Sequence, residues 1–361
     1  MLQTLEIELA LVTGANAHHY SRLLELAAGS RNPFQLPLSL LRREFPYTRW
    51  PSHLHRREMR RLAHNIATDL ARGSYSRIAW HDSDYPELLR QIHSPPAQLF
   101  YRGQRELLQQ PLWGIVGTRN ASRAGREICR RFAREIAARG VVVVSGLARG
   151  IDTAAHQGAL DGGSTIAVLG TGLDSAFPAE NRELQDRIGV EGLLLSEFPP
   201  GAAVQGSNFP RRNRIVAGLV PGVLVGEAPV RSGALITARL ALEENREVYA
   251  LPGCIGDKRY AGNLHLLQQG ALLAVEPEDL LTALSIDHPA PVAGTIPSLP
   301  PLTLSQAAVM ECLAQETSLH VDELQRRTGL PPGELALLLM ELEFAGHLQQ
   351  LPGQYCSQVC R

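Results

Sequence analysis

Three arginines stand directly after short runs of β-branched and apolar residues, in turns that also hold glycine or serine. Arg119 follows residues 113–116, Arg149 follows residues 141–145, and Arg231 follows residues 223–225. A guanidinium is planar and presents several N–H donors to a phosphate, and small residues let backbone amides approach the same anion. If the three runs are parallel strands, the arginines meet at one edge of a sheet. The spacing therefore predicts a binding site for a polyanion.

A further arginine-rich segment, residues 208–218, combines guanidinium groups with an aromatic ring. Arg211, Arg212 and Arg214 follow Phe209 at the expected start of a helix. An arginine can bind phosphate while a ring face stacks on a base, at about 1–3 kcal/mol per base. This combination is typical of proteins that bind single-stranded nucleic acid. Alone, the three arginines could also form a surface ion-pair cluster.

The glycine-bearing turns also predict helix N-termini, whose free amides and dipole favour an anion. Ser122 and Ser232 are good N-cap residues, and a plain strand-to-helix turn capped by Ser122 is the alternative to a binding role. We expect DNA to be bound by these turns together with the arginines and the aromatic ring, namely by Gly117, Arg119, Ser122, Arg149, Phe209, Arg211, Arg212, Arg214, Arg231, Ser232 and Gly233.

Acidic residues beside these turns raise the alternative of an enzyme. Glu227 could orient a guanidinium or act as a general acid or base. Asp152 and His156 are four residues apart, but no activated nucleophile is evident nearby, so we interpret them as a structural pair with Asp152 as a helix N-cap. Arg119 stands where the dinucleotide fingerprint has its second glycine, which argues against NAD. We expect no catalytic residue, no cofactor and no metal.

The elements that would position these residues alternate along the middle of the chain. Short apolar runs separated by amphipathic helical segments predict an α/β fold with a doubly wound parallel sheet. The expected strands are residues 113–116, 141–145, 165–169, 193–196, 223–225, 248–251 and 272–275.

Both ends of the chain differ from this pattern. Residues 1–75 predict a small all-helical domain, and within residues 42–77 nine arginines stand against three acidic residues, which usually indicates a solvated face. Residues 286–302 contain five prolines and predict a linker. After it, helices over residues 305–315, 321–328 and 332–345 and a hairpin over residues 347–355 predict a winged-helix domain. The expected domains are therefore residues 1–75, 76–285, 286–302 and 303–361.

Composition sets limits on where and how the protein acts. The net charge is −1, so total charge gives no sign of nucleic-acid binding, and Lys258 is the single lysine. Five scattered cysteines, no apolar run of membrane-spanning length and no secretory pattern at the N-terminus predict a cytoplasmic protein without a membrane partner. Residues 301–361 hold three arginines against seven acidic residues, a net charge of −4. This charge argues against a transcriptional regulator and favours protein as the partner of the winged helix.

Residues 85–253 resemble the DNA-processing protein A (DprA/Smf) family in many ordered segments. The matching segments include Ile-Val-Gly-Thr-Arg at residues 115–119, Ser-Gly-Leu-Ala-Arg-Gly-Ile-Asp at 145–152, Phe-Pro-Arg-Arg-Asn-Arg-Ile at 209–215 and Ser-Gly-Ala-Leu-Ile-Thr-Ala at 232–238. The resemblance implies an extended Rossmann-like domain that binds and protects single-stranded DNA, forms a homodimer and helps to load a RecA-type recombinase in natural transformation. A nucleotide or ribosyl-phosphate hydrolase is the alternative function.

The chain departs from that family pattern at a few positions. Gly14 is followed by Ala15 and Asn16, where the family often has a Gly-x-Gly hairpin. Leu264 stands where an asparagine is expected, Gly226 replaces a usual valine, and Arg231 replaces a usual lysine with its charge kept.

Overall fold

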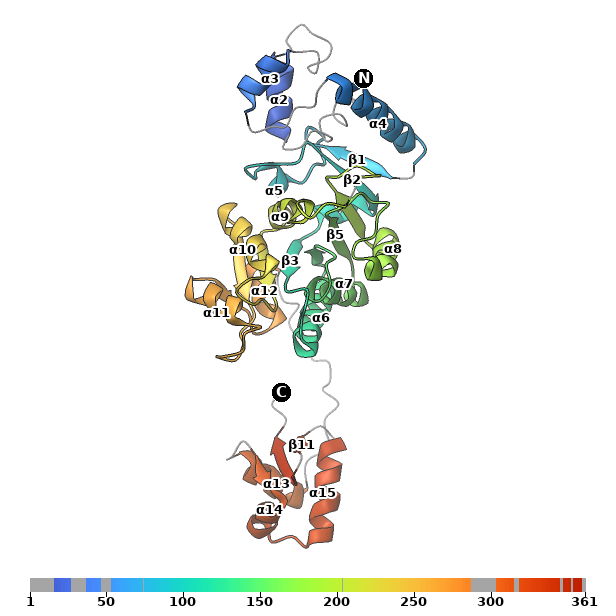
Figure 1. Cartoon of the computed structure of the whole chain (residues 1–361). Coiled ribbons are helices and arrows are strands. Elements are labelled where there is room, and N and C mark those ends of the chain that lie inside the picture. The colour runs from blue at the N-terminus through green and yellow to red at the C-terminus, as the bar shows by residue number, and fades with distance from the viewer. Residues whose placement is uncertain are drawn as a thin grey trace. The chain divides into compact units, whose positions relative to one another are not determined.

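The structure of the chain is a computed structural model (Figure 1). It describes residues 16–26, 37–46, 53–73, 75–202, 204–286, 303–314, 318–344, 347–351 and 353–358. Two compact units form, Met1–Asp287 and His288–Arg361, and each is described by itself. The finer division into four parts stays a prediction, and the proline-rich segment lies almost entirely outside the described residues.

A nine-stranded sheet in the order β1-β2-β6-β5-β4-β3-β7-β8-β9 forms the centre of the first unit. Its seven parallel strands include all seven that the sequence predicts, with ends shifted by at most two residues. They are β3 (Leu112–Val116), β4 (Val142–Ser145), β5 (Thr165–Leu169), β6 (Leu193–Ser196), β7 (Gly222–Val225), β8 (Glu247–Ala250) and β9 (Leu272–Leu273). The doubly wound α/β fold is therefore confirmed.

Two further strands, absent from the sequence-based expectation, extend the sheet beyond β6. β2 (Gln98–Gly103) pairs antiparallel with β6, and β1 (Ser76–Ala79) pairs antiparallel with β2. Both precede the βα units along the chain, and Phe100 and Ile78 are fully buried.

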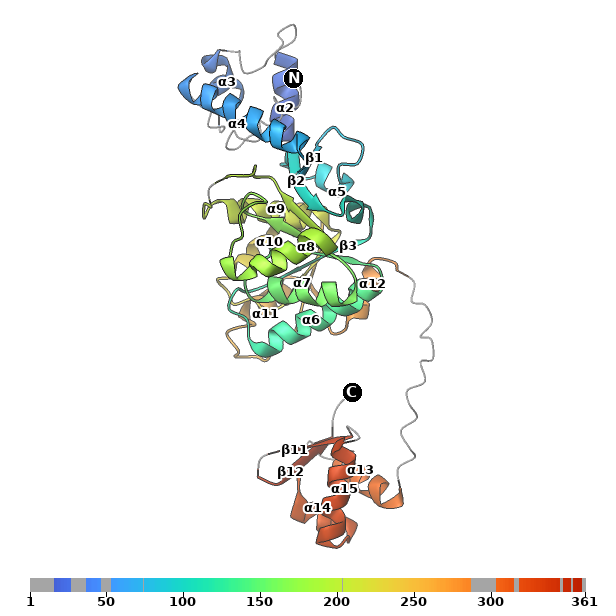
Figure 2. The same ribbon diagram turned by 90° about the vertical axis from the view of Figure 1, so that its right-hand side faces the viewer.

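Helices cover both faces of the sheet (Figures 1 and 2). Val142 and Val144 pack into one core and Val143 into the other, because successive side chains of a strand point to opposite faces. Burial on both faces explains why the parallel strands are continuous apolar runs. One core includes side chains of α5 (Glu87–Arg90), α9 (Asn208–Leu219), α10 (Gly233–Glu243) and α11 (Ala261–Gln268). The opposite core includes α6 (Arg123–Ala138), α7 (Ile151–Gly162) and α12 (Pro277–Ala283).

Near the β1 edge, α8 (Arg182–Glu191) and α4 (His53–Ala71) pack into a third cluster, in which Ala63 and Ile66 meet Phe100. The other N-terminal helices are α2 (Ala17–Leu26) and α3 (Leu38–Glu44), and short 3-10 turns lie at η2 (Arg105–Gln109) and η3 (Ala179–Asn181). Arg57 and Arg61 of the basic segment are exposed. Gly14 and Ala15 lie outside the described residues.

The second unit is a winged helix, as the sequence predicts. Its helices are α13 (Leu304–Ala314), α14 (Val321–Thr328) and α15 (Pro332–Phe344), and its sheet has the order β10-β12-β11, with β10 (Leu319–His320), β11 (Leu348–Leu351) and β12 (Tyr355–Gln358). Leu324, Leu335 and Leu342 belong to its core. None of the described helices of either unit has both the length and the apolar character that crossing a bilayer requires.

Candidate nucleic-acid interface

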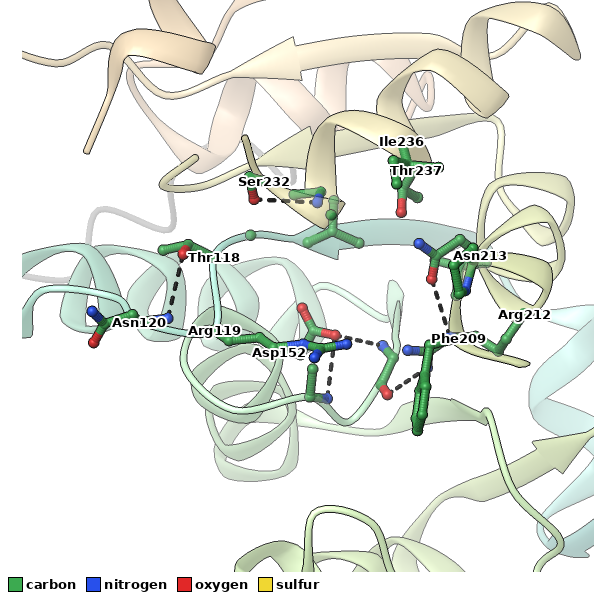
Figure 3. A pocket seen from close by; sticks show the side chains of 18 of the residues that line it. Thr118, Arg119, Asn120, Asp152, Phe209, Arg212, Asn213, Ser232, Ile236 and Thr237 are labelled. Carbon is green, nitrogen blue, oxygen red and sulfur yellow. Dashed lines mark hydrogen bonds between the residues drawn. The ribbon is translucent and has the colours of Figure 1, made fainter. Parts of the chain in front are cut away.

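A cavity of about 420 Å³ opens at the carboxyl edge of the sheet, where β3 lies between β4 and β7 (Figure 3). The chain runs from β3 through β4 to β6 on one side and returns to β7 on the other, so this is the point at which the strand order reverses. Ligands of doubly wound sheets bind at such switch points. The lining includes Thr118, Arg119, Asn120, Gly146, Asp152, Phe209, Arg212, Asn213, Arg231, Ser232, Gly233, Ile236 and Thr237.

Arg119 and Arg231 are exposed cations of this cavity. The guanidinium carbon of Arg119 lies 5.7 Å from the ring centre of Phe209, a cation–π arrangement that leaves its N–H groups available. Among the described residues, neither arginine forms an ion pair. Both can therefore bind an anion without first losing a carboxylate partner.

Arg149 lines an adjoining cavity of about 360 Å³, whose wall also includes Arg119 and Phe209. Its Nε lies 2.7 Å from Oε1 of Glu180, and both side chains are more than half exposed. Ion pairs of that kind contribute about 0–1 kcal/mol, so a phosphate can compete for this guanidinium.

Arg212, by contrast, is buried below the cavity. Its Nη1 donates to the carbonyl oxygens of Gly146 and Val168, and its Nε donates to Oδ1 of Asn213 at 3.2 Å. Burial lowers the pKa of Arg212 to about 10, against the raising effect of Asp152. The residue stays charged at neutral pH and holds the ends of β4 and β5 together.

Arg211 and Arg214 line neither cavity, because both pair with the buried carboxylate of Glu197. Arg211 Nε lies 3.0 Å from Oε2 of Glu197, and Arg214 Nη2 binds Oε1. The ring of Phe198 lies beneath the Arg211 guanidinium, with its centre 5.6 Å away. Of the three arginines of this helix, Arg212 alone lines the two cavities, and a DNA contact of the other two stays a prediction.

Glu227 occupies the N-terminus of α6, for which the sequence suggested an external anion. The backbone amide of Ser122 donates to its Oε1 at 3.1 Å and the Ser122 hydroxyl to its Oε2 at 2.6 Å, while Ser122 caps α6 by accepting from Gly125 N at 2.9 Å. Glu227 is fully buried and lines neither cavity. Among the residues that the structure describes, it therefore orients Ser122 and pairs with no arginine, and the N-cap alternative for Ser122 is confirmed.

Asp152 and His156 hold the turn between β4 and α7. The Asp152 carboxylate accepts from the amides of Gly146 and Ala148 at 3.2 and 3.3 Å, and burial raises its pKa. His156 Nε2 accepts from Leu147 N at 3.3 Å and Nδ1 lies 2.7 Å from the Thr165 hydroxyl. Burial lowers the pKa of His156 to about 3, so it is neutral. The two residues are structural, as expected, but the N-cap of α7 is Gly150 and not Asp152.

Three helices, α6, α7 and α10, begin near the cavity. Among the described residues, a carboxylate occupies the N-terminus of α6 and of α7, whereas the N-terminal amides of α10 face the cavity without one. Ser232 caps it by accepting from Ala234 N at 3.3 Å. No neighbouring atom lies within 4 Å of the place where a Cβ would stand on Gly233. Gly117 is different, since a Cβ there would clash with Ile151. The helix end, Arg231 and Arg119 therefore place N–H donors of the kind that can bind phosphate around one cavity.

Sequence reasoning missed several polar and aromatic residues of this region. Asn120, Asn213 and Thr237 place amide and hydroxyl groups in the first cavity, and Phe177 pairs with Phe209 at a ring distance of 5.1 Å. The aromatic residue before Pro178, in the turn after a strand, was the available signal.

Asn263 was also missed, although it joins the ends of β7 and β8. It is buried, donates to the carbonyl oxygens of Val225, Gly226 and Leu251 at 2.7–3.1 Å, and accepts from Ala228 N at 2.8 Å. The family pattern led us to expect an asparagine at position 264, where this chain has leucine. The preceding residue, Asn263, has a central structural role instead.

Comparison with known proteins agrees with this architecture. Residues 76–285 match the family model of the DNA recombination-mediator protein A, and residues 288–354 match that of the DprA winged helix domain. DNA processing protein DprA of Streptococcus pneumoniae is 48% identical over 201 residues, which cover 55% of this chain and 71% of the relative. Protein Smf of Escherichia coli is 41% identical over 278 residues, which cover 75% of this chain and 74% of the relative.

Solved structures of the same family resemble the chain. DNA processing protein A from Streptococcus pneumoniae has a TM-score of 0.65 and 37% identity, and the match covers 78% of this chain and 96% of that one. DNA processing protein A from Helicobacter pylori, described for its unique single-stranded DNA binding mode, has a TM-score of 0.53 and 30% identity, with 59% and 96% covered. Because a family model spans more than half of its residues, the chain belongs to the DNA recombination-mediator protein A family.

Proposed function

We propose that this protein binds single-stranded DNA at the carboxyl edge of its sheet and acts as a recombination mediator, without catalysing a reaction. The observation that carries the proposal is the meeting of exposed Arg119 and Arg231, the amides at the start of α10 and the ring of Phe209 around one cavity. Phosphate needs the first two kinds of group, and an unstacked base needs the third.

The geometry favours a single strand over a duplex. The cavity is recessed at the sheet edge and lined by Asn213 and Thr237, so a base must leave its stack to enter it. Bases of a single strand can be splayed out in this way, whereas those of a duplex are paired and stacked. The single-stranded DNA binding for which the Helicobacter pylori relative is described supports the same assignment.

The wider role that we propose follows from family membership. A chain that covers single strands would protect incoming DNA in the cytoplasm during natural transformation and help to load a RecA-type recombinase onto it. Its relatives in Streptococcus pneumoniae and Bacillus subtilis are named DNA processing proteins. Co-sedimentation of the recombinase with coated single strands, in the presence and absence of this protein, tests the loading step.

We also propose a homodimer through the Rossmann-like domain. β9 is an edge strand of the sheet, and Leu272, Leu273 and Ile255 are 45%, 50% and 96% exposed. An apolar edge can pair with a second copy, because its backbone groups lack a neighbour on that side. Leu273→Arg should convert a dimer to a monomer in sedimentation analysis, and Val190→Arg, at another exposed apolar position, should not.

The position of Glu227 argues against the alternative function, a nucleotide or ribosyl-phosphate hydrolase. Glu227, the acid or base in that hypothesis, is fully buried against Ser122 and lines neither cavity. A general acid or base must reach the reacting atom directly or through one water.

Both functions can be tested together. Fluorescence anisotropy with labelled single- and double-stranded oligonucleotides should give clearly tighter binding of the single strand. A nucleotide-hydrolysis assay on the same preparation should give no turnover. Equal binding of both DNA forms would contradict the proposal, and turnover that Glu227→Gln abolishes would restore the hydrolase.

A further inference from the structure

The second cavity differs in chemistry from the first, although the two share a wall. Arg119, Phe209 and Arg212 line both, whereas Arg149, Phe177 and Pro178 line the second alone. The first cavity offers hydrogen-bonding groups from Asn213 and Thr237. The side chains that the second adds are aromatic or aliphatic apart from Arg149, so its surface suits a flat ring that is held by stacking.

We propose that the second cavity is a separate nucleotide subsite, in which Phe177 stacks on the base next to the one bound in the first cavity. The proposal rests on the single-stranded DNA binding proposed above and adds a second base position to it. Arg149 is placed to bind the phosphate of that nucleotide, and Arg119 lies at the wall between the two positions.

Phe177 is presented in the way that a stacking platform requires. Its side chain is 45% exposed, and its ring lies 5.1 Å from that of Phe209 with 39° between the ring planes. Because Phe177 is 45% exposed, part of its apolar surface is open to solvent, where a base can cover it. Stacking on a ring tolerates any base, because every base has a π-face.

The segment that carries Phe177 is anchored to the neighbouring turn. Asn181, four residues later, donates from Nδ2 to the carbonyl oxygen of Leu147 at 3.0 Å and to the Thr153 hydroxyl at 2.9 Å. Leu147 follows β4, and Arg149 belongs to the same turn. Hydrogen bonds therefore join the two chain segments that carry the aromatic ring and the arginine.

The Glu180 carboxylate marks where the phosphate would bind. It lies 2.7 Å from Nε of Arg149, and both side chains are more than half exposed. A phosphate is also an anion and can replace this carboxylate with little loss of free energy, because an exposed ion pair contributes little. The subsite thus has a cation that is already oriented and a ring beside it.

The test uses the full chain and oligothymidylate strands in which most positions are abasic. One probe carries a single base and the other carries two adjacent bases. The wild-type protein should bind the two-base probe about 10-fold more tightly than the one-base probe. Phe177→Ala should abolish that difference, and Phe177→Trp should keep it. Tyr355→Ala removes an aromatic side chain of 44% exposure from the winged helix and should change neither affinity.

Failure of the subsite and failure of the proposed function give different results. If Arg119→Ala weakens binding of both probes but Phe177→Ala keeps the two-base preference, the second subsite is refuted and single-stranded DNA binding stands. If Arg119→Ala also leaves both affinities unchanged, the sheet edge does not bind DNA and both proposals fall. Thermal melting of each variant identifies any loss of folding, which the exposed position of Phe177 makes small.

Discussion

The carboxyl edge of the sheet and the winged helix both present a helix to solvent, but with opposite charge. At the sheet edge, the start of α10 is accompanied by exposed Arg119 and Arg231. In the winged helix, exposed Glu334 and Glu341 flank Leu337 and Met340 on α15, which are 66% and 50% exposed. Winged helices are widely known as DNA-binding folds, whereas an open α/β sheet supports many functions. We therefore use the charge on the presented face, more than the fold, to propose which region binds DNA.

Separating the two regions should produce the largest effect. Residues 1–287 should bind single-stranded DNA with nearly the affinity of the full chain. Residues 301–361 should show no binding of single or double strands, which means an affinity at least about 100-fold below that of the full chain for single-stranded DNA. The reason is that phosphate contacts dominate affinity and the fragment is acidic. Anisotropy at physiological salt measures both. Sub-micromolar duplex binding by the smaller fragment would remove the distinction between the regions.

Arginines paired with a buried carboxylate and with an exposed one should differ in how much they stabilise the fold. Glu197→Ala leaves Arg211 and Arg214 without the carboxylate that is 4% exposed between them, and should cost about 3–5 kcal/mol of unfolding free energy. Glu180→Ala removes the exposed partner of Arg149 and should cost at most about 1 kcal/mol. Urea unfolding of both variants compares them. A similar loss of unfolding free energy in the two variants would mean that burial of the carboxylate does not decide how much these ion pairs contribute.

Changing the charge of the acidic region should have the smallest effect. Glu334→Gln together with Glu341→Gln removes two negative charges from α15, and we expect the duplex affinity of the full chain to rise no more than about 3-fold. The change removes repulsion but supplies no phosphate contact. A rise of tenfold or more in anisotropy titrations would show that α15 already lies against DNA and would contradict the prediction that the winged helix binds protein.

The sheet itself could be predicted because its strands are buried on both faces and therefore read as apolar runs. β1 and β2 could not, since their sequences include Gln98, Arg77 and Arg102, and Phe100 of β2 is buried partly by α8, which lies far along the chain. The positions of the cavity residues after β3, β4 and β7 followed from the parallel order alone.

The roles of individual side chains could be predicted less well. Arg211, Arg212 and Arg214 are close in sequence, yet positions on a helix point in different directions, and one is buried while two meet Glu197. Similarly, the Glu227 carboxylate accepts hydrogen bonds at the start of α6 although it lies 105 residues from Ser122 in the sequence. No local pattern around Ser122 could therefore reveal that a carboxylate occupies the N-terminus of α6.

Arg119 tests the central claim most directly, because it is exposed, free of a carboxylate partner among the described residues, and common to both cavities. Single-stranded DNA affinity of the wild type and of Arg119→Ala should be measured over a series of salt concentrations. We predict that the variant loses about 1–3 kcal/mol of binding free energy and that its salt dependence is shallower by about one unit of slope. Equal affinity and equal slope for the two proteins would contradict a DNA site at this edge of the sheet.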